Sequence, residues 1–189
     1  MLLFPRKAFS GSTTMDSRFQ PLARWSYLMM QIFEARSFLD LAEGTYQLHP
    51  KSTLSEILTQ QALFRSFLLS YGKCFASSGK GRSSLDANKV FAGKPESFEV
   101  HRRIMDLRNK FAAHNDVSGL DEAVIEVEER SDEFLIGHRY SFGIPMNECA
   151  SYKTALAVVE EKLLVQINKA LDSLEARLQK KVSVVGNEG

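Results

Sequence analysis

Apolar residues recur at three- and four-residue steps in four long stretches of the chain, which is the spacing of one face of an α-helix. Prolines and glycines lie where these stretches begin or end, as is typical of helix boundaries. The fourth stretch is the longest and carries Lys, Glu and Gln on its opposite side. The pattern predicts four amphipathic helices around one core, at about 21–44, 52–75, 95–115 and 147–181.

The period changes between the third and fourth helical stretches. Ile125 and Val127 alternate with Glu126 and Glu128, and residues 134–142 are rich in strand-forming side chains. A polar turn joins the two segments. The sequence therefore predicts a small β-hairpin at about 121–143, inserted before the long C-terminal helix of an all-α bundle of four to five helices.

The length and composition are those of one ordinary globular domain. The chain has 189 residues, of which 44% are hydrophobic and 25% charged. A domain of this size buries enough surface to fold without disulfides or metals. We expect a single helical domain at 18–182, with flexible tails at 1–17 and 183–189.

Cysteines and histidines are too few and too scattered for a structural metal site. Cys74 and Cys149 cannot form a disulfide framework, and the four histidines match no zinc-ligand spacing. We expect no metal, no cofactor and a reducing, cytoplasmic setting. No apolar run approaches the ~20 residues of a membrane span, so no membrane association is expected.

Charge is unevenly distributed along the chain. Residues 65–115 hold ten Lys and Arg against four Asp and Glu, whereas residues 116–161 hold three against eleven. Such asymmetry is typical of a face that binds a polyanion, and equally of two faces that pair across a homodimer. The sequence alone leaves both alternatives open.

One short segment, 106–116, brings Arg108, Asn109 and His114 together at the end of the third predicted helix. On a straight α-helix, Arg108 and His114 lie about 9 Å apart along the axis and roughly 120° apart around it. A joint site therefore requires His114 to turn back from the helix end, or two copies of the helix to face each other. The chemistry available to such a group is RNA cleavage without a metal: Arg108 grips the phosphate, His114 moves a proton near pH 7, and Asn109 orients either partner.

At these residues the chain resembles the HEPN superfamily, whose signature is an Arg, a polar residue and a His four to six positions after the Arg. The resemblance covers about 18–181 and implies a bundle that dimerises along the motif helix. In many members it implies a metal-independent endoribonuclease of toxin–antitoxin or phage-defence systems. An RNA substrate, a homodimer and an antitoxin or other defence-system partner follow from it. Members partnered by a minimal nucleotidyltransferase have a Tyr two residues after the His, where this chain has Asp116.

Further positive charges lie near the motif and in a Gly/Ser-rich loop, and they are candidates for contacting an RNA backbone: Arg102, Arg103, Lys110, Lys80 and Arg82. The alternative for each is a solvated surface charge. His101 is expected at the surface. The competing function is a non-catalytic dimeric module of the same fold that binds RNA, a nucleotide or a protein.

Overall fold

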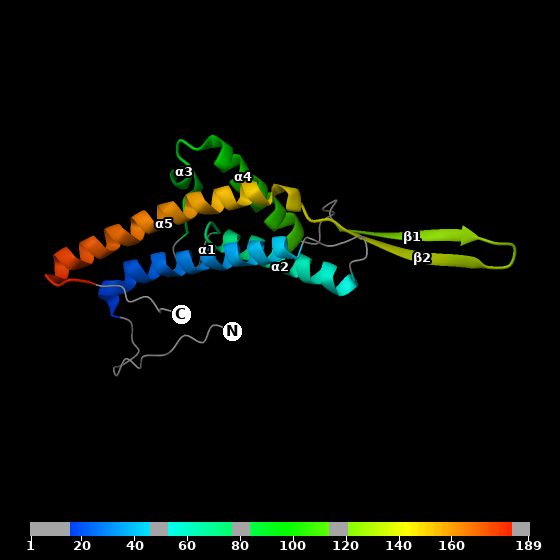
Figure 1. The fold of residues 1–189 in the computed structure, drawn as a ribbon, viewed down its shortest axis with the longest axis horizontal. Coiled ribbons are helices and arrows are strands. Elements are labelled where there is room, and N and C mark those ends of the chain that lie inside the picture. The colour runs from blue at the N-terminus through cyan, green and yellow to red at the C-terminus, as the bar shows by residue number, and fades with distance from the viewer. Residues whose placement is uncertain (1–15, 46–52, 77–83, 114–120, 183–189) are drawn as a thin grey trace.

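Helices dominate the structure, a computed structural model that describes residues 16–45, 53–76, 84–113 and 121–182 (Figure 1). Five α-helices are joined by short 3-10 and π-helical segments, with a two-stranded antiparallel hairpin before the last helix. In chain order the elements are η1 (Ser17–Phe19), α1 (Gln20–Gly44), α2 (Leu54–Lys73), α3 (Ala87–Val90), α4 (Pro95–Leu107), η2 (Arg108–Ala113), β1 (Asp121–Glu129), β2 (Phe134–Phe142), η3 (Met146–Glu148) and α5 (Cys149–Leu178).

The predicted fold class is confirmed, because the described part of the chain is mostly helical with a hairpin before the long C-terminal helix. The structure adds two local details that the sequence pattern did not define. The N-cap of α2 is Thr53, whose hydroxyl accepts from the backbone N–H of Glu56 while the Glu56 carboxylate accepts from the backbone N–H of Thr53. The helix α3 has only four residues, which is too short for a hydrophobic periodicity to reveal it in the sequence. The predicted tails lie mostly outside the described residues, and Ser17 already begins η1.

The core is built on one face of α2. Phe64, Phe67 and Tyr71 recur along that face and are fully buried. The Phe67 ring lies 5.7 Å from the ring of Tyr152 on α5, and the Phe64 ring lies 6.1 Å from it. These tilted ring contacts join α2 to α5 across the middle of the bundle, and other residues of α2 contact α1 and α4.

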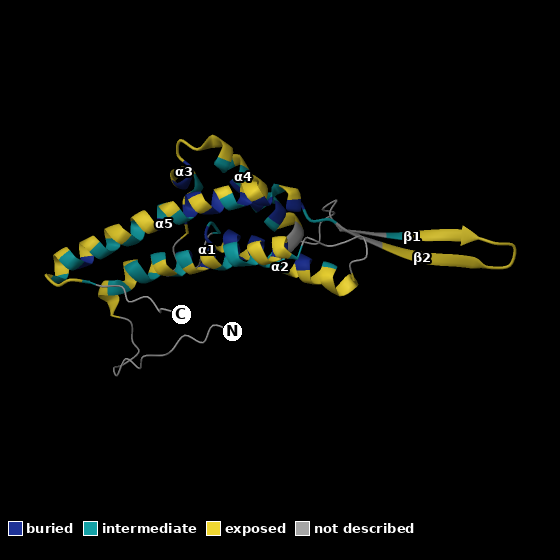
Figure 2. Cartoon of the chain, in the orientation of Figure 1, coloured by how far each residue is buried: buried dark blue, intermediate teal, exposed yellow. Residues whose placement is uncertain are grey.

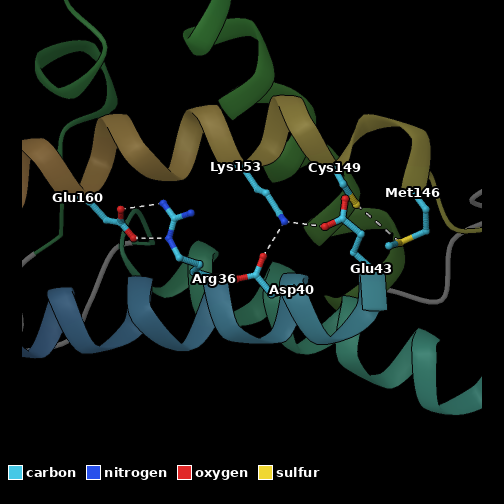
Figure 3. Close-up of polar contacts among 7 residues, drawn as sticks. All are labelled: Arg36, Asp40, Glu43, Met146, Cys149, Lys153 and Glu160. Carbon is cyan, nitrogen blue, oxygen red and sulfur yellow. Dashed lines mark hydrogen bonds and ion pairs between the residues drawn. The ribbon is translucent and has the colours of Figure 1, made fainter. Parts of the chain in front are cut away.

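Polar contacts hold α1 against α5 (Figure 3). The Arg36 guanidinium donates two hydrogen bonds of 2.7 Å to the two carboxylate oxygens of Glu160. Nearer the start of α5, the Lys153 ammonium lies 2.7 Å from Asp40 and 2.6 Å from Glu43. The early part of α5 contacts the late part of α1, so the two helices run antiparallel. These ion pairs define the axial register of the two helices.

The hairpin projects from one end of the helical bundle (Figures 1 and 2). In the hairpin register Val127 is opposite Ile136, so their side chains lie on the same side of the sheet. Side chains two positions apart on a strand also share a side, which adds Ile125 and Phe134. That side carries four large apolar side chains, each 60–64% exposed, which we call the hairpin apolar face: Ile125, Val127, Phe134 and Ile136.

His101 is buried, with 6% of its surface exposed, and the expectation of a surface residue is wrong. Its Nδ1 shares a 2.9 Å hydrogen bond with the hydroxyl of Tyr71. Three phenylalanine rings surround the imidazole: Phe75 at 4.4 Å, Phe91 at 5.1 Å and Phe98 at 5.9 Å between centroids. In the structure His101 lies on the side of α4 that faces α2. The spacing of apolar residues in the sequence did not show on which side of the helix His101 lies.

We expect the buried imidazole to make the protein less stable in mild acid. Desolvation lowers the pKa of His101 to about 4. Below the ordinary pKa of about 6.5 the unfolded chain takes up a proton that the folded protein excludes until about pH 4, so stability falls as the pH falls through this window. The free energy of unfolding, measured in urea, should drop by about 2 kcal/mol from this group between pH 7 and pH 5.

The double variant Tyr71→Phe/His101→Phe removes the titrating group together with its hydrogen-bond partner. Its unfolding free energy should lose this part of the pH dependence, although its stability at pH 7 can differ from that of the wild type. An equal slope in wild type and variant would show that His101 is not excluded from protonation in the folded state.

Candidate functional site

The motif segment begins where α4 changes into a π-helix. Residues Arg108–Ala113 form η2, which follows α4 without a break. π-Helical turns are rare and occur frequently at functional sites. The calculation that placed Arg108 and His114 on a straight α-helix therefore does not hold beyond Leu107. His114 itself lies outside the described residues.

Arg108 extends along the surface of α2 at Gly72. A Cβ atom added to Gly72 would lie 3.1 Å from Nε, 3.2 Å from Cγ and 3.3 Å from Cδ of Arg108. A Cβ atom here would be in tight contact with the arginine stem, which would have to shift by a few tenths of an ångström to accommodate it. The Nε atom is buried and has no hydrogen-bond partner, whereas the side chain as a whole is half-buried. Gly72 therefore allows the stem of Arg108 to pack closely against α2.

The outer part of the guanidinium contacts Asn109. Nη1 of Arg108 donates a 3.0 Å hydrogen bond to Oδ1 of Asn109, which is exposed. Within the described residues no carboxylate forms an ion pair with Arg108. The adjacent Lys110 differs, because its ammonium lies 3.2 Å from Asp106 one turn earlier. In the described part of the chain, the hydrogen-bond partner of the positively charged Arg108 side chain is thus a neutral amide, and its other N–H groups can donate to an anion.

The three predicted RNA-binding cations that the structure describes are each paired with a carboxylate. Arg102 pairs with Glu99 on its own helix at 3.0 Å. Arg103 reaches Glu148 at 3.1 Å, at the start of α5. Lys110 pairs with Asp106, as described above, and Lys80 and Arg82 lie outside the described residues. All three described cations are exposed, and exposed ion pairs of this kind contribute at most about 1 kcal/mol each, so they can exchange partners.

The sequence reasoning missed Gly72. Its signal is a glycine inside an otherwise regular helix, which costs about 1 kcal/mol relative to alanine and so calls for a reason such as close packing. Among the described residues, no group of three His, Cys, Asp or Glu side chains is arranged to hold a metal ion. The described helices also include none that is long and apolar enough to cross a membrane.

The two cysteines are not activated nucleophiles. Both are buried, and burial raises the pKa of Cys74 to about 12 and that of Cys149 to about 11. Cys74 directs its thiol toward the backbone oxygens of Leu28 and Ser70. Thiolate chemistry at neutral pH is therefore disfavoured at both positions.

Comparisons of the chain with protein-family models, with curated proteins and with solved structures each found no match.

The contact between Gly72 and Arg108 predicts an energetic coupling. In the Arg108→Ala background, Gly72→Ala removes a helix-interior glycine without crowding and should stabilise the protein by up to about 1 kcal/mol. With Arg108 present, the new methyl group presses on the arginine stem, so the gain should be smaller by about 1 kcal/mol. Urea denaturation of the four proteins in this cycle measures the difference.

Gly44 supplies a matched control, because a Cβ atom there would meet nothing within 4 Å. Gly44→Ala should change stability equally with and without Arg108. If Gly72→Ala also gave the same change in both backgrounds, Gly72 would have no part in holding Arg108.

Proposed function

We propose that this protein is a metal-independent endoribonuclease that acts as a homodimer on cytoplasmic RNA, with Arg108, Asn109 and His114 at its site. The observation that carries the proposal is the environment of Arg108: its stem packs on α2 at Gly72, its guanidinium donates to Asn109, and it has no carboxylate partner among the described residues. The Arg-Asn pair followed by His114 is the pattern by which the chain resembles the HEPN superfamily.

The reaction that fits these groups is internal transesterification of RNA. The ribose 2'-oxygen attacks the adjacent phosphorus, the bond from phosphorus to the 5'-oxygen breaks, and the 5'-oxygen takes a proton. The products end in a 2',3'-cyclic phosphate and a 5'-hydroxyl. His114 moves the proton, while Arg108 stabilises the negative charge that develops on the phosphorane oxygens.

Asn109 has a positioning role in this scheme. Its side-chain oxygen already accepts from Nη1 of Arg108, which limits the directions in which the remaining guanidinium N–H groups can point. A guanidinium with a fixed orientation can donate two parallel hydrogen bonds to one phosphate. Arg102, Arg103, Lys110, Lys80 and Arg82 are proposed to contact the RNA backbone around the cleaved bond, and an antitoxin or other defence protein is the proposed regulator.

A second function remains in competition, and one observation favours it. Arg102, Arg103 and Lys110, the three described candidates for RNA contacts, are each paired with a carboxylate, so in the described part of the chain they do not add unpaired positive charge to that of Arg108. A non-catalytic dimeric module that binds RNA, a nucleotide or a protein would need no such additional charge.

The two functions are separated by a cleavage assay in EDTA on a mixed panel of tRNA and single-stranded RNA. We expect the wild type to cleave, and Arg108→Ala and His114→Ala to lose at least about 100-fold in rate, because each variant removes charge stabilisation or proton transfer. Products should carry a cyclic phosphate. Arg24→Ala, an exposed arginine on α1, is the control and should cleave as the wild type does.

Each protein is first shown to be folded by its helical circular dichroism and its melting transition. Retention of full activity by His114→Ala would overturn the assigned role of that residue. If none of the folded proteins cleaves RNA in the panel, the non-catalytic module becomes the better account.

A further inference from the structure

Each strand of the hairpin has one edge without a neighbouring strand in the described part of the chain. The sheet consists of β1 and β2 alone, each nine residues long, and it projects from one end of the bundle (Figure 1). Along such an edge, alternate residues direct their backbone N–H and C=O groups outward. The outer edge of β1 can therefore pair with the backbone of a further extended segment, a binding mode known as strand addition.

The two sides of β1 differ in chemistry. Ile125 and Val127 belong to the hairpin apolar face and are 62% and 60% exposed. Glu126 and Glu128 alternate with them, so the glutamate side chains lie on the opposite side of the sheet. In a strand that pairs with β1, every second side chain lies beside the two apolar residues, and the intervening side chains lie beside the two glutamates.

Negative charge exceeds positive charge over the hairpin, even when its internal ion pairs are taken into account. Residues 124–139 contain five carboxylates and two arginines. Arg139 contacts Glu126 at 3.2 Å. Arg130 contacts Glu128 at 3.0 Å and one further carboxylate of the turn. Two cations leave an excess of negative charge, and exposed ion pairs are weak enough to exchange with an incoming cation.

We propose that the outer edge of β1 binds an extended segment of another protein in which apolar residues alternate with Lys or Arg. The backbone of the segment pairs with β1, its apolar side chains extend the hairpin apolar face, and its cations lie beside Glu126 and Glu128. This interaction surface does not involve Arg108 and goes beyond the proposed ribonuclease activity.

The strands of a second copy of this chain do not have the required chemistry. In any register that keeps the apolar residues on one side, pairing of β1 with another β1 brings glutamates beside glutamates, which is destabilising. On the same side of the sheet as these glutamates, β2 carries Leu135, Gly137 and Arg139. It therefore offers one cation, which already contacts Glu126 of its own hairpin. The partner strand thus comes from a different, basic segment.

The outer edge of β1 also differs from the other exposed apolar surfaces of the described chain. A basic segment paired with β2 would meet the positive charge of Arg139 instead of two carboxylates. The exposed apolar residues of α1, α2 and α5 lie on helices, whose backbone groups are paired within the helix and cannot accept a strand. The excess of carboxylates disfavours polyanions such as RNA at the hairpin.

A synthetic peptide of about seven residues in which lysine and valine alternate is the probe, since this is a common strand length. We expect saturable binding to the full chain, measured by fluorescence anisotropy of the labelled peptide. A peptide of the same composition with its valines and lysines in two separate blocks should bind at least about ten-fold more weakly, because it cannot place all its cations on one side of a strand.

Backbone methylation distinguishes strand addition from attraction between charges. Two further peptides carry N-methyl groups on alternate residues, one in each of the two possible patterns. Only alternate N–H groups of an added strand point toward β1, so one pattern should abolish binding and the other should leave it intact. Equal binding of both methylated peptides would contradict the proposal.

Reversal of charge on β1 tests the assigned residues. Glu126→Lys/Glu128→Lys should lose affinity for the lysine–valine peptide by at least about ten-fold and should gain affinity for a peptide in which glutamate and valine alternate. Glu96→Lys/Asp172→Lys makes the same change in charge at exposed positions of α4 and α5, and it should bind both peptides as the wild type does. All proteins are first compared by their melting transitions.

Two further results would overturn the proposal. The first is absence of saturable binding of the lysine–valine peptide at millimolar concentration. The second is a dimer, seen by light scattering, that does not bind the peptide and that Ile125→Glu/Ile136→Glu converts to a monomer, because a second copy would then cover the hairpin. None of these measurements uses RNA, so their outcome is separate from that of the proposed ribonuclease.

Discussion

The buried face of α2 is the constraint on which the rest of the structure depends. Its aromatic rings contact α5 through Tyr152, its Tyr71 hydroxyl meets His101 on α4, and its Gly72 receives the stem of Arg108. One helix thus sets the positions of two others and of the motif residue. Since interiors pack at crystal-like density, a change in this face would be transmitted to all three contacts.

Periodicity was enough to find the four long helices and both strands of the hairpin. The alternation around Ile125 and Val127 gave the strand segment, and the acidic turn after Glu129 separated the two strands. Local hydrogen bonding was harder to predict. Ser52, Thr53 and Ser55 all have hydroxyl side chains of the kind that caps a helix. The structure identifies Thr53 as the N-cap, because Thr53 and Glu56 each accept a hydrogen bond from the backbone N–H of the other. The identity of a helix cap depends on backbone angles, which the residue types alone do not define.

The candidate site was predictable in part. Arg108 and Asn109 stood out as a residue combination, and their side chains do contact each other. The place of Gly72 depends on how α2 and η2 approach each other, and the burial of His101 depends on which side of α4 faces the core. Both are tertiary facts. The carboxylate partners of Arg102 and Arg103 show why counts of positive charge overstate a nucleic-acid surface: Arg102 is paired within one turn of its own helix, and Arg103 is paired with Glu148 just before α5.

The π-helical character of η2 has a consequence for the length of the motif segment. A π-helix closes its hydrogen bonds over one more residue than an α-helix, as if one residue had been inserted into a regular helix. Loss of a single residue from 108–113 would let the segment return to α-helical pairing, because the extra residue that the π-helix accommodates would be gone. The remaining side chains of the segment would then be spaced by the α-helical step of about 100° per residue. The angle between Arg108 and the later residues of this segment therefore depends on how many residues it contains as well as on which residues they are.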